Sequence, residues 1–449
     1  MSYQFCGMQP YKHQIEIINF MLQNKRAYNF SDLGSGKTSA SIWACDMLLE
    51  ANKIKKVLIV CPLSIMRAVW AEEIEKVVPN RSYSIVHGSR IKRLKALEKR
   101  AHFYIINSDG VGSYYNELLH SKFDVVIIDE VDSFKNPTSQ RSKRMQLIAK
   151  NVMACYGLTC TPMGNSPEEA FGIGRVINPD NLPTRYITKW RSMTMIQVGP
   201  YAFMPSADAQ DIVYKALQPA VRFKLSDCVD IPDIIFEYRE FQMTKEQAKL
   251  YKEIFLHQVA DYEGGIIKAP TAGVKFTKLL QIAGGAVYDS DGNTIALPVK
   301  DKIQEVLHVQ KEAGQVIVFC QFIELIKQLE RAIPEAKSIY GKTNQSARAD
   351  IISAFRAGKF NILIAQPRVM AHGVNLQFCH TIIFYGPILG NNFYRQAIGR
   401  IRRSGQKYKQ TIINFFSSSI EKKLYKTLET KNVSSESLLK MYEDNTNEH

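Results

Sequence analysis

Short apolar runs rich in β-branched and aromatic residues alternate with longer amphipathic stretches in two separate parts of the chain. The first part contains AYNF from Ala27, VLIV from Val57, FYII from Phe103 and VVIID from Val125. The second part contains VIVFC from Val316, ILIA from Ile362, TIIFYG from Thr381 and TIINFF from Thr411. Strands that alternate with helices form parallel sheets covered on both faces. The sequence therefore predicts an α/β protein with two such sheets.

The region between the two blocks departs from this pattern. Residues 179–218 are irregular, and a Gly-Pro pair inside MIQVGPYAFMP predicts a β-hairpin near residues 193–204. Residues 244–281 are mostly helical. Because 449 residues exceed what one core usually supports, several domains are expected. The predicted division is a first lobe at 1–220, a linker and helical insertion at 221–295, and a second lobe at 296–449.

The charge balance favours a polyanionic partner. Lys plus Arg number 58 against 43 Asp plus Glu, a net charge of +15. Such an excess attracts nucleic acid and accelerates association with it. The alternative is that the charge only keeps the chain soluble.

The sequence argues against a zinc site and a membrane segment. Eight cysteines fall singly, with no Cys-x-x-Cys pair, which predicts small core residues in a reducing compartment. No apolar run approaches the roughly 20 residues of a membrane helix, and the N-terminus shows no signal region. A location in the cytoplasm or nucleoid is expected.

The segment SDLGSGKTSAS begins at Ser31, directly after the first apolar run and before an amphipathic stretch. This order of strand, glycine-rich loop and helix is typical of a phosphate-binding loop. The glycines allow close approach to phosphate oxygens, the lysine would reach the β- and γ-phosphates, and the threonine hydroxyl would hold Mg²⁺. Ser31 replaces the usual distal glycine, and a glycine turn that only caps a helix is the alternative. The predicted nucleotide-binding residues here are Gly34, Ser35, Gly36, Lys37, Thr38 and Ser39.

The run VVIIDEVD ends a predicted strand with Asp129 and Glu130. Carboxylates at this end of a parallel strand lie at the edge where ligands bind. Asp129 would hold the metal through water, and Glu130 would orient or deprotonate the attacking water. Exposed loop acids are the alternative if the run is taken alone.

The segment QAIGRIRRSGQ spans Gln396 to Gln406 in the second block. If it is helical, Arg400 and Arg403 lie three residues apart on one face. An arginine supplied to the γ-phosphate from another lobe stabilises charge in the transition state. A solvated basic helix face is the alternative.

These motifs and their order resemble the motor of superfamily 2 helicases, and within it the SNF2-type branch; the compact size is similar to phage-encoded members. The segments that carry the resemblance are QPYKHQIEIINF, DLGSGKT, VCPLSIMRAVWAEEIEKV, INSDG, DEVDSFKNPTSQRSK, GLTCTPMGNSPEEAFG, VFCQFIELIKQLE, HGVNLQ and QAIGRIRRSGQ. The resemblance implies two tandem RecA-like parallel-sheet lobes with a helical insertion between them, with ATP and Mg²⁺ clasped by both lobes.

The resemblance also implies roles for further residues. Gln14 matches the glutamine that reads adenine, and Gln396 joins the arginines as a catalytic residue. By the same resemblance, the residues that couple ATP hydrolysis to DNA movement are Asp132, Thr159 and Thr161, although Asp132 stands where the family often has His. The predicted DNA-binding residues are Pro62, Leu63, Ser64, Asn107, Ser108, Lys135, Asn136, Gln321, Gly341, Lys342, Arg348, Gly373 and Asn375. For Ser64, a helix N-cap is an alternative that does not exclude strand contact.

The expected function is an ATP-dependent DNA helicase or translocase. It would grip duplex and branched DNA through sequence-independent backbone contacts, and would remodel forks or Holliday junctions by branch migration and unwinding. Two alternatives remain: an RNA helicase, and a nucleotide-gated DNA-binding subunit of a restriction or remodelling complex. The sequence identifies no protein partner.

Overall fold

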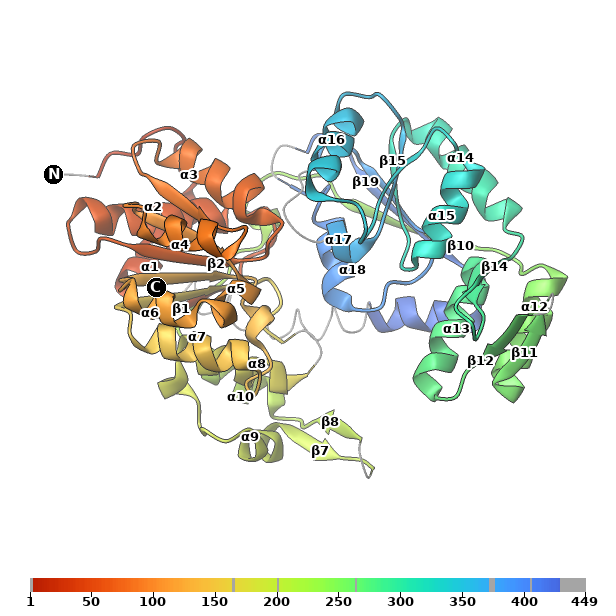
Figure 1. Ribbon diagram of the computed structural model, residues 1–449, viewed down its shortest axis with the longest axis horizontal. Coiled ribbons are helices and arrows are strands. Elements are labelled where there is room, and N and C mark those ends of the chain that lie inside the picture. The colour runs from red at the N-terminus through yellow and green to blue at the C-terminus, as the bar shows by residue number, and fades with distance from the viewer. Residues whose placement is uncertain are drawn as a thin grey trace. The chain divides into compact units, whose positions relative to one another are not determined.

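The computed structural model describes residues 3–163, 166–199, 202–262, 265–370, 376–403 and 406–428. Contacts divide the chain into two units, the first ending at Asp230 and the second beginning at Ile231. Each unit contains its own parallel β-sheet with helices on its faces (Figure 1). The predicted fold class, an α/β protein with two tandem parallel-sheet lobes, is confirmed.

The sheet of the first unit has seven strands in the order β3-β4-β2-β5-β6-β1-β9. Every neighbouring pair is parallel, so the carboxyl ends of all seven strands share one edge. The strands are β1 Arg26–Asn29, β2 Val57–Cys61, β3 Tyr83–Val86, β4 Phe103–Asn107, β5 Val125–Asp129, β6 Ala154–Leu158 and β9 Ala220–Val221.

Helices cover both faces of this sheet. They are α1 Lys12–Gln23, α2 Lys37–Glu50, α3 Glu72–Val77, α4 Arg90–Glu98, α5 Ser108–Ser113, α6 Tyr115–His120, α7 Gln140–Lys150 and α8 Pro167–Ile177. Strand β2 is buried along its whole length. Its Leu58 and Val60 belong to the cluster formed with α7 and α8, whereas Ile59 belongs to the cluster formed with α1 and α2. This burial on both faces explains the continuous apolar run of β2.

A small excursion interrupts the first unit between α8 and β9. It contains a 3-10 turn Pro179–Asn181, α9 Ile187–Thr194, β7 Met195–Gln197, β8 Phe203–Pro205 and α10 Ala209–Ala216. Strands β7 and β8 pair antiparallel, and the resulting hairpin projects away from the sheet (Figure 1). Residues 200–201 of its turn lie outside the described part of the chain. A short helix, α11 Leu225–Cys228, follows β9.

The sheet of the second unit has six parallel strands in the order β10-β19-β18-β15-β17-β16. They are β10 Ile234–Glu240, β15 Val316–Phe319, β16 Lys337–Ile339, β17 Ile362–Ala365, β18 Thr381–Phe384 and β19 Gln410–Phe416. The helices around it are α14 Lys300–Ala313, α15 Ile323–Ala332, α16 Gln345–Arg356, α17 Pro367–Met370 and α18 Asn391–Ile398.

The insertion lies between β10 and α14, beside the sheet of the second unit (Figure 1). It contains two helices, α12 Lys245–His257 and α13 Ala272–Gly284, and two antiparallel hairpins, β11 Val259–Tyr262 with β12 Gly265–Lys268 and β13 Ala286–Tyr288 with β14 Thr294–Ala296. Leu250, Ile254, Ile267, Leu279 and Ile282 form its small core. The insertion is therefore a folded subdomain rather than a connecting linker.

Candidate nucleotide site and nucleic-acid-contact loops

The glycine-rich loop connects the carboxyl end of β1 to the first turn of α2. Gly34 and Gly36 adopt left-handed backbone angles, with φ of 84° and 78°. A Cβ atom added to Gly36 would lie 2.0 Å from Gln14 Nε2. Both the backbone angle and the space therefore require glycine at position 36. The Gln14 amide donates a hydrogen bond of 3.4 Å to the Gly36 carbonyl, which brings the two predicted residues together.

The first turn of α2 has the features of an anion site. No side chain caps its N-terminus at Gly36, and the positive end of the helix dipole lies there together with free backbone amides. Lys37 Nζ donates to the carbonyls of Ser31 and Asp32, so its ammonium group lies over the loop. The chemistry of this set, with the Thr38 hydroxyl beside it, fits the phosphates and Mg²⁺ of a bound nucleotide.

Residues far away in the sequence hold this loop. Arg222, which is 3% exposed, donates to the Phe30 carbonyl at 3.1 Å and pairs with Asp32 at 3.3 Å. The second Asp32 oxygen accepts from the backbone amide of Leu225 at 3.1 Å. His13 Nε2 lies 2.8 Å from the Ser35 carbonyl. Arg222 lies in none of the quoted sequence motifs, and His13 lies beside Gln14 in one of them but was given no role.

Asp129 and Glu130 lie at the same edge of the sheet as the loop. Asp129 ends β5, and Trp70 Nε1 donates to its Oδ2 at 2.9 Å. The Glu130 amide donates to Asp129 Oδ1 at 3.1 Å. Glu130 has a left-handed φ of 52°, which is uncommon for a residue other than glycine and is typical of functional positions. Both acids therefore lie at the carboxyl edge of the sheet from which the glycine-rich loop also leaves.

Asp132 and Lys135 follow in the next turn. Burial raises the pKa of Asp132 to about 6; the nearby Lys135 opposes this rise and the Glu169 carboxylate adds to it. Lys135 Nζ pairs with Glu169 Oε1 of α8 at 2.7 Å. The Asn136 side-chain oxygen accepts from the amide and hydroxyl of Thr138 at 3.0 and 2.8 Å. These two predicted DNA-binding side chains thus also hold the local structure.

Thr159 and Thr161 are buried after β6, at 1% and 2% exposed. The Thr161 amide donates to Thr159 Oγ1 at 3.1 Å. The Thr159 amide donates to the carbonyl of Asn29, the last residue of β1, at 3.2 Å. The segment with Thr159 and Thr161, which is predicted to couple hydrolysis to movement, is therefore hydrogen-bonded to the strand that leads into the phosphate-binding loop.

The predicted strand-contacting loops of the first unit come from adjacent strands. Pro62, Leu63 and Ser64 follow β2, and Asn107 and Ser108 lie at the end of β4. Leu63 is 44% exposed. The Ser108 hydroxyl donates to the carbonyl of Cys61 at 3.4 Å, which joins the two loops. The next helical turn, Met66–Ala71, has Ile65 at its N-cap position, so Ser64 does not cap it.

In the second unit, Gln366 joins two predicted loops at the carboxyl ends of β15, β16 and β17. Its Nε2 donates to the carbonyl of Gln321 at 3.4 Å, and its Oε1 accepts from the Gly341 amide at 3.2 Å. Lys342 is exposed. Arg348 Nε donates to the carbonyl of Thr343 at 2.8 Å. Sequence reasoning missed Gln366, which no motif quoted above contains.

The arginine segment differs from its prediction. Helix α18 ends at Ile398 with Gly399 at its C-cap, so Arg400 and Arg403 follow the helix in a turn and do not share a helical face. The condition for a shared face, a helical segment, is therefore not met beyond Ile398; glycine, which stands at position 399, is a poor helix former. Gln396 and Arg400 are buried, at 3% and 4% exposed. Gly373 and Asn375 lie outside the described residues.

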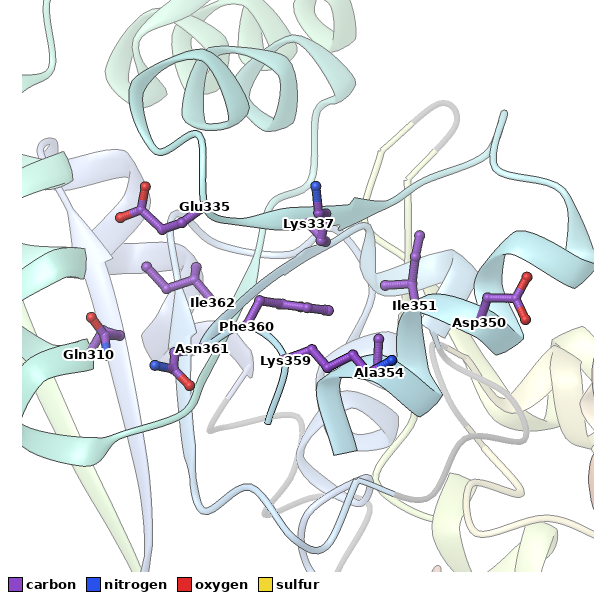
Figure 2. A pocket seen from close by; sticks show the side chains of 10 residues that line it. All are labelled: Gln310, Glu335, Lys337, Asp350, Ile351, Ala354, Lys359, Phe360, Asn361 and Ile362. Carbon is purple, nitrogen blue, oxygen red and sulfur yellow. The ribbon is translucent and has the colours of Figure 1, made fainter. Parts of the chain in front are cut away.

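A hollow of about 740 Å³ opens at the other edge of the second sheet. Figure 2 shows Lys337, Phe360 and Ile362 around it, together with Ile351 and Ala354 of α16. Lys337 and Ile362 begin β16 and β17, so the hollow lies at the amino ends of these strands. No predicted site residue lines it, and it is separate from the loops described above.

The described residues contain no helix that is long and apolar enough to cross a membrane. Within the same residues, no group of three or more His, Cys, Asp or Glu is placed to hold a metal ion. The eight cysteines are free thiols, six of them buried.

Two family models match the chain. The SNF2-related domain matches residues 13–333, which is more than half of the chain, and the helicase conserved C-terminal domain matches residues 299–405. The chain belongs to the SNF2-related family. With both domains present, the prediction of an ATP-hydrolysing DNA helicase or translocase is confirmed.

Several proteins are similar to this chain over most of its length. "Putative protein p41" of Acyrthosiphon pisum secondary endosymbiont phage 1 is 26% identical over 422 residues, which are 88% of each chain. "Uncharacterized ATP-dependent helicase YqhH" of Bacillus subtilis is 23% identical, covering 93% of this chain and 77% of that protein. "Chromatin remodeling factor mit1" of Schizosaccharomyces pombe is 22% identical, but the chain spans only 32% of its length. The Sulfolobus solfataricus SWI2/SNF2 ATPase core, solved with dsDNA, aligns over 98% of this chain and 97% of its own with a TM-score of 0.47 and 20% identity.

Proposed function

We propose that this SNF2-related protein uses ATP and Mg²⁺ to move along duplex DNA and to remodel branched DNA such as forks and four-way junctions. One observation carries the proposal: the phosphate-binding loop, the acidic pair and the predicted strand-contacting loops all lie at one edge of the first sheet. A change at the nucleotide can therefore reach the DNA-contacting loops through a single rigid sheet.

The residues of the first unit supply the nucleotide chemistry. Lys37 and the amides at the start of α2 bind the phosphates, and Thr38 and Asp129 would hold Mg²⁺. When bound, Mg²⁺ neutralises negative charge on the β- and γ-phosphates. Glu130 orients the attacking water or accepts its proton. From the second unit, Arg400 and Arg403 stabilise the charge that develops on the γ-phosphate, with Gln396 assisting.

The loops after β2 and β4 and the turn after β5 contact the DNA backbone. Their strands are neighbours in the order β4-β2-β5, so the loops form a continuous row. Serine and asparagine side chains and backbone amides suit phosphate oxygens, and such contacts do not read sequence. The net charge of +15 favours association with this polyanion. In the second unit, the loops around Gln321, Gly341, Lys342 and Arg348 serve the same purpose.

The β7–β8 hairpin supports the proposed action on branched DNA. Its apolar side chains are exposed: Ile196 at 56%, Val198 at 56%, Phe203 at 40% and Met204 at 57%. Side chains of this kind can insert between bases and unstack them. Arg191 of α9 holds the hairpin base, because its guanidinium lies 5.3 Å from the centre of the Phe203 ring and pairs with Glu168.

Replacing the hairpin by a short turn tests this role. We expect DNA-stimulated ATP hydrolysis to persist while unwinding of a fork falls severely, since the hairpin lies outside the sheet edge that binds nucleotide. Met204→Ser is a milder variant, and Leu147→Ser on α7, where Leu147 is 48% exposed, is its matched control. Equal loss of ATP hydrolysis and unwinding in the hairpin variant would contradict a strand-separating role.

A panel of labelled substrates tests the proposal as a whole. Linear duplexes, forks and four-way junctions are incubated with protein and ATP, and ATP hydrolysis is measured beside strand or branch movement. The proposal predicts stimulation by duplex DNA and conversion of forks or junctions. Stimulation by RNA instead of DNA would support the RNA-helicase alternative, and DNA binding without turnover would support the nucleotide-gated subunit.

A further inference from the structure

The three tryptophans of the chain are buried in the first unit and differ in what their indole N–H groups contact. Trp190 Nε1 donates to the carbonyl of Pro167 at 2.9 Å. Among the described residues, nothing accepts a hydrogen bond from Trp43 Nε1. Trp70 Nε1 donates to Asp129 Oδ2 at 2.9 Å. One of three similar indole groups is therefore aimed at the carboxylate that the proposed function assigns to the metal.

Both oxygens of that carboxylate accept hydrogen bonds. Oδ2 accepts from Trp70 and Oδ1 accepts from the Glu130 amide at 3.1 Å. One donor at each oxygen fixes the plane of the carboxylate about its χ2 bond, which otherwise rotates broadly. Because Trp70 is 0% exposed, water does not compete for its N–H group. The indole therefore holds Asp129 in one orientation before any nucleotide is bound.

The local backbone explains how Trp70 reaches Asp129. Residues Met66–Ala71 form a π-helical turn that continues directly into α3. Such turns are rare, are wider than an α-helix and are frequent at functional sites. Glu73 in α3 accepts a hydrogen bond from the Ser39 hydroxyl in the first turn of α2. The segment Met66–Val77 therefore contacts both nucleotide motifs.

We infer that Trp70 is a positioning residue for ATP hydrolysis: its indole N–H orients the Asp129 carboxylate toward the Mg²⁺ of the bound nucleotide. The inference rests on the proposed role of Asp129. Donors that orient metal-binding carboxylates typically change metal affinity or activity by about 10- to 100-fold when removed. No sequence motif indicates this hydrogen bond, because 59 residues separate its two partners.

Trp70→Phe tests the inference, because phenylalanine keeps an aromatic ring in the core and removes the N–H group. We expect the Mg²⁺ concentration that gives half-maximal ATP turnover to rise about tenfold. Trp43→Phe and Trp190→Phe are the matched controls; the first removes an N–H that donates no hydrogen bond to any described residue, and the second removes the hydrogen bond to Pro167, which has no proposed role in nucleotide binding. Both should stay within about twofold of the unmutated protein. Thermal unfolding of all three variants shows which of them are folded.

A second measurement needs neither metal nor turnover. Three tryptophans give three indole N–H signals in a ¹⁵N-resolved NMR spectrum, and each Trp→Phe variant identifies one. In the nucleotide-free protein, Asp129→Ala should move the Trp70 signal upfield and leave the Trp43 and Trp190 signals in place. This experiment decides the matter even if Trp70→Phe fails to fold.

Two results would overturn the inference: a Trp70 signal that does not respond to Asp129→Ala, or a folded Trp70→Phe variant with an unchanged Mg²⁺ requirement. Failure of the proposed function looks different. In that case Asp129→Ala would hydrolyse ATP like the unmutated protein, whereas failure of the inference alone leaves the Asp129→Ala variant inactive.

Discussion

The glycine-rich loop of the first unit and the arginine turn of the second hold their cations in different ways. Lys37 begins a 14-residue helix, and its ammonium group donates to two backbone carbonyls of the loop. Arg403 lies beyond the end of α18, with Nε 3.4 Å from the Gly399 carbonyl, and burial lowers the pKa of its guanidinium. In the proposed function, Lys37 would exchange these carbonyls for phosphate oxygens, whereas Arg403 is already partly desolvated and would interact strongly with an anion. We expect the first to act in binding and the second in turnover.

Arg403→Ala sharpens this comparison and has the largest expected effect among the variants that keep nucleotide binding. ATP turnover should fall about 1000-fold, because removal of an arginine that faces the γ-phosphate typically costs 10³ to 10⁵ in rate. Nucleotide affinity should stay nearly unchanged. Steady-state turnover and binding of a fluorescent ATP analogue measure the two effects. Unchanged turnover would place Arg403 outside the catalytic machinery.

Gly36→Ala tests the glycine-rich loop, which is the first of the two regions compared. Alanine would have to adopt the left-handed φ of 78° at this position, and its methyl group would collide with the Gln14 side chain. The loop must therefore shift, and kcat/KM for ATP should fall about 100-fold. Gly358→Ala is the matched control, since Gly358 has a φ of 69° and open space around its Cβ position. The control should lose about 1 kcal/mol of stability and keep its ATP turnover. Equal kinetics in the two variants would mean that the loop tolerates a side chain.

Asp132→Asn has the smallest expected effect and concerns stability. The pKa of Asp132 is raised to about 6, so the folded protein binds its proton more tightly than the unfolded chain. The stability that this proton provides is present at acid pH and is lost as pH rises through about 6. Asparagine carries no charge, so the variant should gain about 2 to 3 kcal/mol relative to the unmutated protein as the pH rises from about 4 to about 7.

Urea unfolding of both proteins at the two pH values measures this difference. Lys135, Glu169 and Asp129 are the charged groups that act on Asp132, and all three remain in the variant. A difference in stability that does not change with pH would show that Asp132 is already ionised in the folded protein under acid conditions.

The sequence predicted those elements whose local pattern is strong. Strands β2 and β5 are continuous apolar runs because both faces of the sheet are covered, and the predicted residues match their bounds closely. Strand β6, ACYGL, escaped the prediction because alanine and glycine carry little strand signal. Its Gly157 is explained only by packing, since a Cβ atom there would lie 3.0 Å from Ile177.

The site was predictable where function depends on consecutive residues. The loop around Lys37 and the pair Asp129–Glu130 each lie in one short segment, so their spacing is visible in the sequence. Arg222, Gln366 and the bond between Trp70 and Asp129 were not predictable, because tertiary folding alone brings their partners together. Trp70 is buried in the core, but no pattern in the sequence indicated its hydrogen bond to Asp129.

The central claim is that the carboxyl edge of the first sheet hydrolyses ATP in response to DNA. The most direct test compares steady-state ATP turnover of the unmutated protein and Lys37→Ala with saturating duplex DNA and without DNA. The account predicts turnover that DNA stimulates in the unmutated protein and that Lys37→Ala abolishes in a folded chain. Equal turnover in the two proteins would contradict it.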